Sequence, residues 1–125
     1  MRELIVGTRR SPLAQAQTAA VLAALRARTP DLRAQVRLIV TTGDRRAREP
    51  LQQLGGKGVF TRELEEALLA GAIDLAVHSL KDLPVALPAG LALGAILARG
   101  PAEDVLVAAP GTELGALLSG ARVGT

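Results

Sequence analysis

Residues 73–84, IDLAVHSLKDLP, join a short apolar strand to a run of polar and ionisable side chains that ends at a proline. Ile73–Val77 has the length and composition of a buried strand, and Pro84 cannot continue a hydrogen-bonded ladder. In open α/β sheets, ligands bind at the carboxyl ends of such strands. Lys81 beside Asp82 at that place can hold an anionic group, while the carboxylate stabilises a cation or moves a proton. A surface turn with solvated charges is the alternative.

Two helices are predicted ahead of this stretch. Ser11 is a favourable N-cap and Pro12 a favourable first residue for one helix, which Thr29-Pro30 ends. The other helix spans Thr61–Ala70, with glutamates in its first half and Gly71 as its C-terminal stop. Their apolar stripes are Leu13, Ala16, Ala20, Val21, Ala24 and Leu25 in the first helix, and Phe60, Leu64, Ala67 and Leu68 in the second.

Two more strands complete the pattern. Leu4–Val6 is a short apolar strand closed by Gly7, and a second strand runs from Val36 to about Thr41. The order strand, helix, strand, helix, strand implies right-handed crossovers and a largely parallel sheet covered by helices. The sequence therefore predicts an α/β fold.

Beyond residue 90 the sequence predicts a second, incomplete unit. Leu91–Leu97 is a further apolar strand, and the Arg-Gly-Pro sequence that opens residues 99–103 marks a hinge. The remaining predicted elements are a strand at Val105–Val107, a short helix at Glu113–Leu118 and a strand that begins at Arg122-Val123. We therefore expect domain 1 to span residues 1–98 and domain 2 to start within residues 104–125, in a chain cut from a longer protein.

The composition narrows the classes of function. The chain has 125 residues, 49% of them hydrophobic, and a net charge of +3. It has no cysteine and a single histidine, which excludes a disulfide, a thiol nucleophile and a multi-histidine metal site within it. Phe60 is its only aromatic residue, which argues against base stacking on nucleic acid. Because it has neither an apolar run of about eighteen residues nor a clear signal sequence, we expect a cytoplasmic protein without a membrane span.

Three further groups of residues are candidates for binding anions. Arg9 and Ser11 at the start of the first helix form either a carboxylate or phosphate site, or an ordinary N-cap with solvated charges. Gly55–Gly58, which includes Lys57, resembles a phosphate-binding nest but lacks the Walker spacing, and a flexible hinge is the other interpretation. The third group is the basic cluster Arg45, Arg46 and Arg48, which is either solvated or binds a polyanion.

Two of these groups belong to a long polar loop, Thr42–Gly58. Loops of this length without secondary structure are usually functional or mobile. Within it, Asp44 follows a glycine and reads as a turn residue. His78, near the end of the third strand, reads as a structurally satisfied histidine. Because the carboxyl ends of parallel strands meet at one edge of a sheet, we expect three positive sites, Arg9 with Ser11, Lys57 and Lys81, to line one cleft with Asp82. Such a cleft would bind a carboxylate-rich small molecule.

Four motifs, in this order and spacing, resemble the porphobilinogen deaminase (hydroxymethylbilane synthase) family. They are TRRSPLA at 8–14, TGD at 42–44, GGKGVFTRELE at 55–65 and HSLKDLP at 78–84. The resemblance implies a cytoplasmic transferase of haem and tetrapyrrole biosynthesis, monomeric at full length. It would condense four porphobilinogen molecules head to tail, with release of ammonia, to linear hydroxymethylbilane. It also implies a periplasmic-binding-protein-like (type II) two-domain architecture, with most of domain 1 and the start of domain 2 in this chain.

The same resemblance assigns roles to single residues. Asp82 would be the catalytic acid, because a carboxylate at a pyrrole N–H stabilises the positive charge that develops when ammonia leaves. The residues that would bind cofactor or substrate are Arg9, Ser11, Lys57, Phe60, Ser79, Lys81 and Thr125. Of these, Lys57 and Phe60 would lie in a loop that flanks the site, and Thr125 would begin a cofactor-binding stretch.

The implied cofactor is dipyrromethane, attached through a thioether to a cysteine of a third domain. This chain has no cysteine, so we expect it to be inactive alone. Gln53 stands where family members often carry a lysine, a departure that bears on one carboxylate contact.

Two other classes of function remain open. A non-catalytic anion-binding module of the same architecture explains the sheet, the hinge and the cations, but not a carboxylate among them. A nucleic-acid binder that uses the basic cluster is disfavoured by the small net charge and the lack of aromatic residues.

Overall fold

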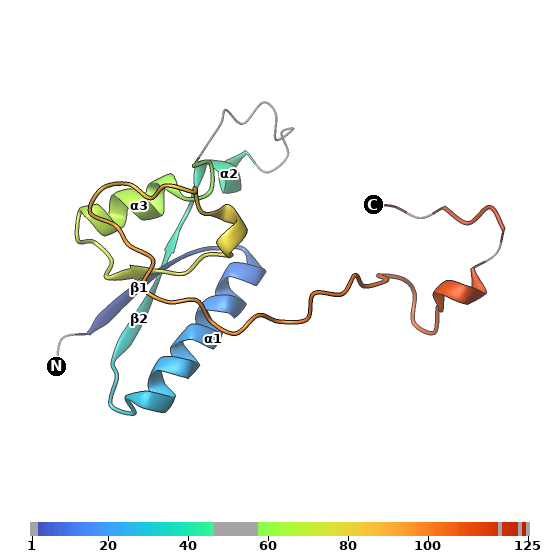
Figure 1. Cartoon of the computed structure of the whole chain (residues 1–125), viewed down its shortest axis with the longest axis horizontal. Helices are drawn as coiled ribbons and strands as arrows, with labels where there is room; N and C mark the ends of the chain where they lie inside the picture. Colours follow the sequence, from blue (N-terminus) through green and yellow to red (C-terminus); the bar gives the residue numbers. More distant parts are fainter. Residues whose placement is uncertain (1–2, 47–57, 118, 123, 125) are drawn as a thin grey trace.

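A computed structural model describes residues 3–46, 58–117, 119–122 and 124 of the chain, and within them shows an α/β unit on a three-stranded parallel sheet (Figure 1). The strands are β1 (Leu4–Arg9), β2 (Ala34–Ile39) and β3 (Leu75–Ala76), in the order β2-β1-β3. The helices are α1 (Pro12–Arg28), α2 (Thr42–Arg45) and α3 (Arg62–Leu69), with short 3-10 helices η2 (Leu80–Asp82) and η3 (Leu114–Ala116). The predicted α/β class and parallel sheet are confirmed.

The central strand β1 packs on both of its faces. The Thr8 hydroxyl donates to the carbonyl of Ala14 in α1 at 3.2 Å. Gly7, the preceding residue, faces the opposite side, where an added Cβ would lie 2.3 Å from Ile73 Cδ1 and 3.1 Å from Leu64 Cδ2. A glycine is suited to this position because the apolar core fills the space of its missing side chain. Gly7 therefore lies inside β1, and the prediction that it closes the strand is wrong.

Helix α1 begins at its predicted cap. The Ser11 hydroxyl accepts a hydrogen bond from the N–H of Ala14 at 3.3 Å. The buried positions of α1 are Ala14, Thr18 and Leu22. The predicted apolar stripe of this helix is wrong: Leu13, Ala16, Ala20 and Ala24 are exposed, and Val21 and Leu25 are only half-buried. A threonine can replace an apolar residue in the stripe because the Thr18 hydroxyl donates to the Ala14 carbonyl at 2.8 Å.

Helix α3 matches its prediction more closely. Leu64 is fully buried in the core, and Glu63 and Glu65 lie in the first turn, where carboxylates favour the helix dipole. Gly71 follows the helix with a φ of 67°, the left-handed conformation that favours glycine after a helix.

The predicted loop 42–58 begins with a helix instead. A capping box closes α2: the Thr41 hydroxyl accepts the N–H of Asp44, and the Asp44 carboxylate accepts the N–H of Thr41, both at 3.2 Å. Asp44 is thus a helix-capping residue. Residues 47–57, which include Arg48, Gln53 and Lys57, lie outside the described residues.

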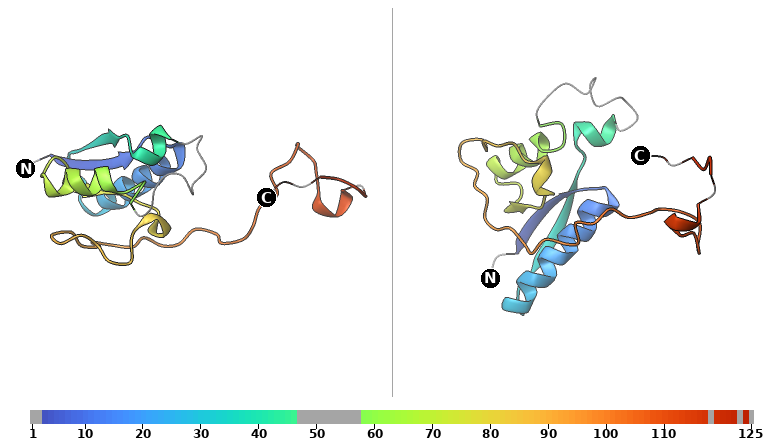
Figure 2. Two further views of the ribbon diagram at one scale, coloured as in Figure 1. Left: turned by 90° about the horizontal axis from the view of Figure 1, so that it is seen from above. Right: turned by 45° about the vertical axis from the view of Figure 1, so that its right-hand side comes forward.

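The predictions for the C-terminal quarter are partly wrong. Leu91–Leu97 and Val105–Val107 form no strand with any described residue, and most of their large apolar side chains are exposed. A strand needs a neighbour for its backbone hydrogen bonds, and the described chain runs away from the sheet here (Figure 2). The predicted helix Glu113–Leu118 is reduced to η3, and Val123 of the last predicted strand lies outside the described residues. None of the described helices combines the length and apolar character that a membrane crossing needs.

Candidate functional site

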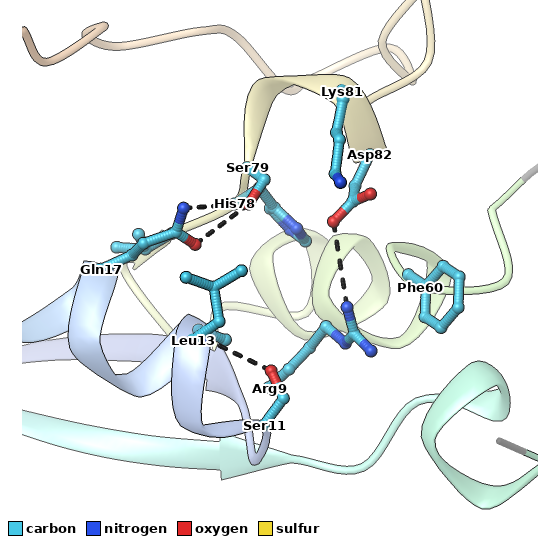
Figure 3. Close-up of a pocket in the computed structure, with 11 residues that line it drawn as sticks. Arg9, Ser11, Leu13, Gln17, Phe60, His78, Ser79, Lys81 and Asp82 are labelled. Atoms are coloured by element: carbon cyan, nitrogen blue, oxygen red, sulfur yellow. Dashed lines mark hydrogen bonds and ion pairs between the residues drawn. The ribbon is translucent and has the colours of Figure 1, made fainter. Parts of the chain in front are cut away.

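A pocket of about 230 Å³ lies where β1 and β3 end, beside the N-terminus of α1 (Figure 3). The predicted site residues that line it are Arg9, Ser11, Phe60, Ser79, Lys81 and Asp82. Lys57 and Thr125 lie outside the described residues. The pocket is also lined by Leu13, Gln17 and His78, for which the sequence predicts no role in binding.

Arg9, the last residue of β1, is held from two sides. Its Nε and Nη2 donate to Asp44 Oδ1 at 3.1 and 2.6 Å. Its guanidinium carbon lies 4.2 Å from the centre of the Phe60 ring, a cation–π contact. The remaining nitrogen, Nη1, lies 3.9 Å from Asp82 Oδ2. Two of the three guanidinium nitrogens are therefore bonded to Asp44, and only Nη1 faces Asp82.

Asp82 is the only acid among the described residues that line the pocket. It lies in η2, where its N–H donates to the Ser79 carbonyl at 2.9 Å. Its side chain is 24% exposed and is therefore partly removed from water. Lys81 is exposed, and Figure 3 shows its side chain alongside that of Asp82. The 3-10 turn thus places a carboxylate and an ammonium group next to each other at the pocket.

Ser79 is tied to α1 by Gln17. The Gln17 Nε2 donates to Ser79 Oγ at 3.0 Å, and the hydroxyl donates back to Gln17 Oε1 at 3.1 Å. A hydroxyl can do both because it carries one proton and two acceptor lone pairs. Gln17 lies one turn after Leu13 on the same side of α1, and both residues line the pocket. The sequence signal that could have identified Gln17 is its place, as a polar residue, four positions after Leu13.

Ser11 belongs both to the start of helix α1 and to the lining of the pocket. It is the N-cap of α1, as the simpler interpretation predicts, but Arg9 is not solvated as that interpretation requires, because it pairs with Asp44. It also lines the pocket, so its position is compatible with ligand binding, which stays a prediction.

His78 lies just beyond β3 and is half-buried. Burial lowers the pKa of its imidazole, although the negative charges of Asp82 and Glu65 act in the opposite direction. The ring is therefore neutral at about pH 7, with one nitrogen able to donate and the other to accept. It lines the pocket, which the prediction of a structural histidine had not included.

These residues define the class of protein as an α/β protein whose pocket is lined by the cations Arg9 and Lys81 and by one carboxylate, a lining that suits an anionic small molecule. No group of three His, Cys, Asp or Glu side chains within the described part of the chain could hold a metal ion. The carboxylate can accept a hydrogen bond from an N–H group, or stabilise a cation, at the centre of such a ligand.

The chain belongs to the porphobilinogen deaminase family. The family profile "Porphobilinogen deaminase, dipyromethane cofactor binding domain" matches residues 4–125. The protein named porphobilinogen deaminase from Roseiflexus sp. is 52% identical over 122 residues, which cover 98% of this chain and 40% of that protein. Those from Syntrophobacter fumaroxidans and Geobacillus kaustophilus are 48% identical over 124 residues and 46% identical over 125 residues, covering 99% and 100% of this chain. The chain spans about 40% of the length of each of these relatives.

Proposed function

We propose that this chain is the N-terminal portion of a hydroxymethylbilane synthase and carries its catalytic carboxylate, Asp82. The reaction would join four porphobilinogen molecules head to tail, release ammonia at each step and yield linear hydroxymethylbilane for haem and other tetrapyrroles. The observation that carries the proposal is the position of Asp82. Among the described residues it is the single carboxylate, partly buried, of a pocket that Arg9, Lys81 and two serine hydroxyls also line.

The substrate explains why one carboxylate is useful among cations. Porphobilinogen carries a pyrrole N–H and an aminomethyl group as well as two carboxylates. Loss of ammonia leaves an electron-deficient pyrrole, and Asp82 would accept its N–H and stabilise the positive charge. The partial burial of Asp82 strengthens this interaction because water screens it less. A module that only binds anions would gain nothing from a carboxylate at this point.

The other residues of the pocket would bind the acetate and propionate groups. Arg9 would offer the Nη1 edge of its guanidinium, Lys81 its ammonium group, and Ser11 and Ser79 their hydroxyls. Phe60 would pack against a pyrrole ring. Lys57 and Thr125 would add a cation and a hydroxyl from segments beyond the described residues.

The pocket also suits dipyrromethane, a pair of pyrroles with the same acetate and propionate side chains. Its cations and hydroxyls match these carboxylates, and Asp82 matches the pyrrole N–H groups. Bound there, the cofactor would supply the free pyrrole carbon to which the first substrate is joined. The thiol that attaches it must come from outside these residues, because the chain has no cysteine.

We further propose that the full-length protein is a cytoplasmic monomer with a periplasmic-binding-protein-like (type II) two-domain architecture. Residues 1–98 would supply most of domain 1, residues 99–103 a hinge and residues 104–125 the start of domain 2. The exposed apolar side chains of Ile96 and Val107 support this arrangement, because further chain would cover them.

The test uses a full-length form, defined as this chain followed by the part of the Roseiflexus relative that lies beyond the match. Supplied with porphobilinogen, the full-length form should consume pyrrole and form bilane. Asp82→Asn should lower kcat by about 100-fold or more with an unchanged circular dichroism spectrum, since a stabilising group of the transition state is lost. Asp31→Asn, which removes an exposed acid outside the pocket, is the matched control. The 125-residue chain alone should form no bilane.

Two results would change the proposal. Equal activity of Asp82→Asn and the unchanged protein would remove Asp82 from its role. No turnover by a folded full-length form loaded with cofactor would favour the non-catalytic anion-binding module.

A further inference from the structure

Arg9 lies between two carboxylates and is bonded to only one of them. Asp44 takes its Nε and Nη2, at 3.1 and 2.6 Å, whereas Asp82 lies 3.9 Å from Nη1, beyond hydrogen-bond distance. We propose that Asp44 is a positioning residue that keeps Arg9 from closing onto Asp82. This inference rests on the proposed role of Asp82, because it explains how the oxygens of that carboxylate stay available for a pyrrole N–H.

Asp44 is itself fixed in place and stays ionised. Its Oδ2 accepts the Thr41 hydroxyl at 2.8 Å and the Thr41 N–H at 3.2 Å, and its side chain is only 7% exposed. Burial raises the pKa of this carboxyl, but the hydrogen bonds from Arg9 and Thr41 outweigh it, so that the pKa lies below its ordinary value. A charged, immobile carboxylate is what a lasting hold on a guanidinium requires.

The short helix that carries Asp44 is anchored at its other end. The N–H and the hydroxyl of Thr42 both donate to Glu63 Oε1, at 2.7 and 2.6 Å. Gly43 donates its N–H to the Val59 carbonyl at 2.9 Å and packs closely against the Phe60 ring. Helix α2 is therefore held between α3 and Arg9, and the direction of the guanidinium depends on both contacts.

Without Asp44 the guanidinium has a second acid within reach. Nη1 would need to move by about 1 Å to form a charge-assisted hydrogen bond with Asp82. A bidentate pair would then occupy both oxygens of Asp82 and neutralise the carboxylate. The other charged or titratable groups at Asp82 are His78 and Lys81 from its own segment, and His78 in turn feels the charge of Glu65 in α3.

The direct test is a crystal structure of the full-length form with Asp44→Asn. Asparagine can still accept from Thr41 but carries no charge, so Arg9 should turn to Asp82 with N···O distances of about 2.8 Å. Arg9 remaining in its present place would overturn the inference. Asp44→Ser, which keeps a short hydrogen-bonding side chain at the third position of α2, replaces Asp44→Asn if that variant does not fold. The position of Arg9 in this crystal structure decides the inference whether or not the full-length form turns over porphobilinogen. A lack of turnover would count only against the proposed function.

Kinetic measurements with and without Arg9 provide a second test, because a purely structural role of Asp44 would not depend on Arg9. In Asp44→Asn, kcat should fall by about 10-fold, because Arg9 would occupy the oxygens of Asp82. In an Arg9→Gln background the same substitution should leave kcat unchanged. An equal fall with and without Arg9, or no fall in either, would contradict the inference. Asp31→Asn should leave kcat unchanged.

Discussion

The side chains of Gln17 and Ser79 exchange two hydrogen bonds, at 3.0 and 3.1 Å, and so join helix α1 to the segment that carries Asp82 (Figure 3). Both residues line the pocket. Because the two bonds use both halves of the amide, they fix the direction in which the Ser79 hydroxyl points. To bind a ligand carboxylate, the Ser79 hydroxyl would turn its single proton from Gln17 Oε1 to the ligand and keep the hydrogen bond from Gln17 Nε2.

Gln17→Ala should weaken substrate binding without unfolding the protein. Losing one neutral hydrogen-bonding partner is worth about 0.5–1.5 kcal/mol, so KM in the full-length form should rise by roughly 2- to 10-fold. Gln15→Ala, an exposed glutamine of the same helix that bonds the Arg10 carbonyl, is the control. A KM that changes equally in both variants would mean that the Gln17–Ser79 contact has no part in binding.

Two substitutions at Ser11 separate its capping role from its binding role. Ser11→Ala removes the acceptor for the Ala14 N–H and should lower the free energy of unfolding by about 1 kcal/mol. Ser11→Asp keeps a good N-cap but adds a negative charge to a pocket for carboxylates. It should therefore retain the stability and raise KM, as urea unfolding and steady-state kinetics would measure. Unchanged KM in Ser11→Asp would confine Ser11 to capping.

Gly43→Ala should disturb the contact between α2 and Phe60. An added Cβ would lie 2.0 and 2.3 Å from the Phe60 ring carbons Cε1 and Cδ1, so that the ring or the helix must move. Overpacking of this kind costs about 1–3 kcal/mol of stability and would also move the ring from the Arg9 guanidinium. Gly94→Ala, whose Cβ would meet nothing within 4 Å, should change the unfolding free energy by less than about 0.5 kcal/mol. Equal stability of the two variants in urea would contradict the packing argument.

His78 should make the stability depend on pH. Burial lowers the pKa of the imidazole in the folded protein, whereas an unfolded histidine titrates near pH 6.5. As the pH falls through about 6.5, the unfolded state binds the proton first, and the free energy of unfolding decreases. His78→Gln should lack this slope between about pH 7 and 5 in urea unfolding of the full-length form.

Asp44 and Glu63 also make the stability depend on pH, but in a lower pH range than His78. Hydrogen bonds from Arg9 and Thr41 to Asp44, and from Thr42 to Glu63, outweigh burial and lower the pKa of both carboxyls. Their contribution to stability is present above their unfolded pKa values and is lost below about pH 4.5. It therefore falls outside the window of His78. An identical slope from about pH 7 to 5 with and without His78 would assign the effect to another group.

The N-terminal elements could be predicted from the sequence because their signals are local. Ser11-Pro12 marks the start of α1, and Gly71 marks the end of α3. The strands at 91–97 and 105–107 could not be predicted reliably, because an apolar run becomes a strand only when a neighbour pairs with its backbone. The chain spans about 40% of the length of its curated relatives, and no described residue pairs with these segments.

Some residues of the candidate site could likewise be predicted from the sequence, and others could not. Asp82, Lys81 and Ser79 follow a strand directly in the sequence, so their place at a sheet edge could be deduced from topology alone. Gln17 and Asp44 could not be assigned to the site, because each acts on a residue far away in the chain. The buried stripe of α1 was also misjudged, since Thr18 is buried through a hydrogen bond that the apolar pattern does not record.

The sequence by itself determined the α/β class, the parallel order of strands, the cap of α1 and the set of ionisable groups at the strand ends. These depend on local propensity and on the chirality of crossovers, which neighbouring residues specify. Only the tertiary structure decided that Asp44 rather than Asp82 takes the Arg9 guanidinium, with distances of 2.6 Å against 3.9 Å. The strength of an ion pair depends on separation and burial, and both arise only when distant segments pack together.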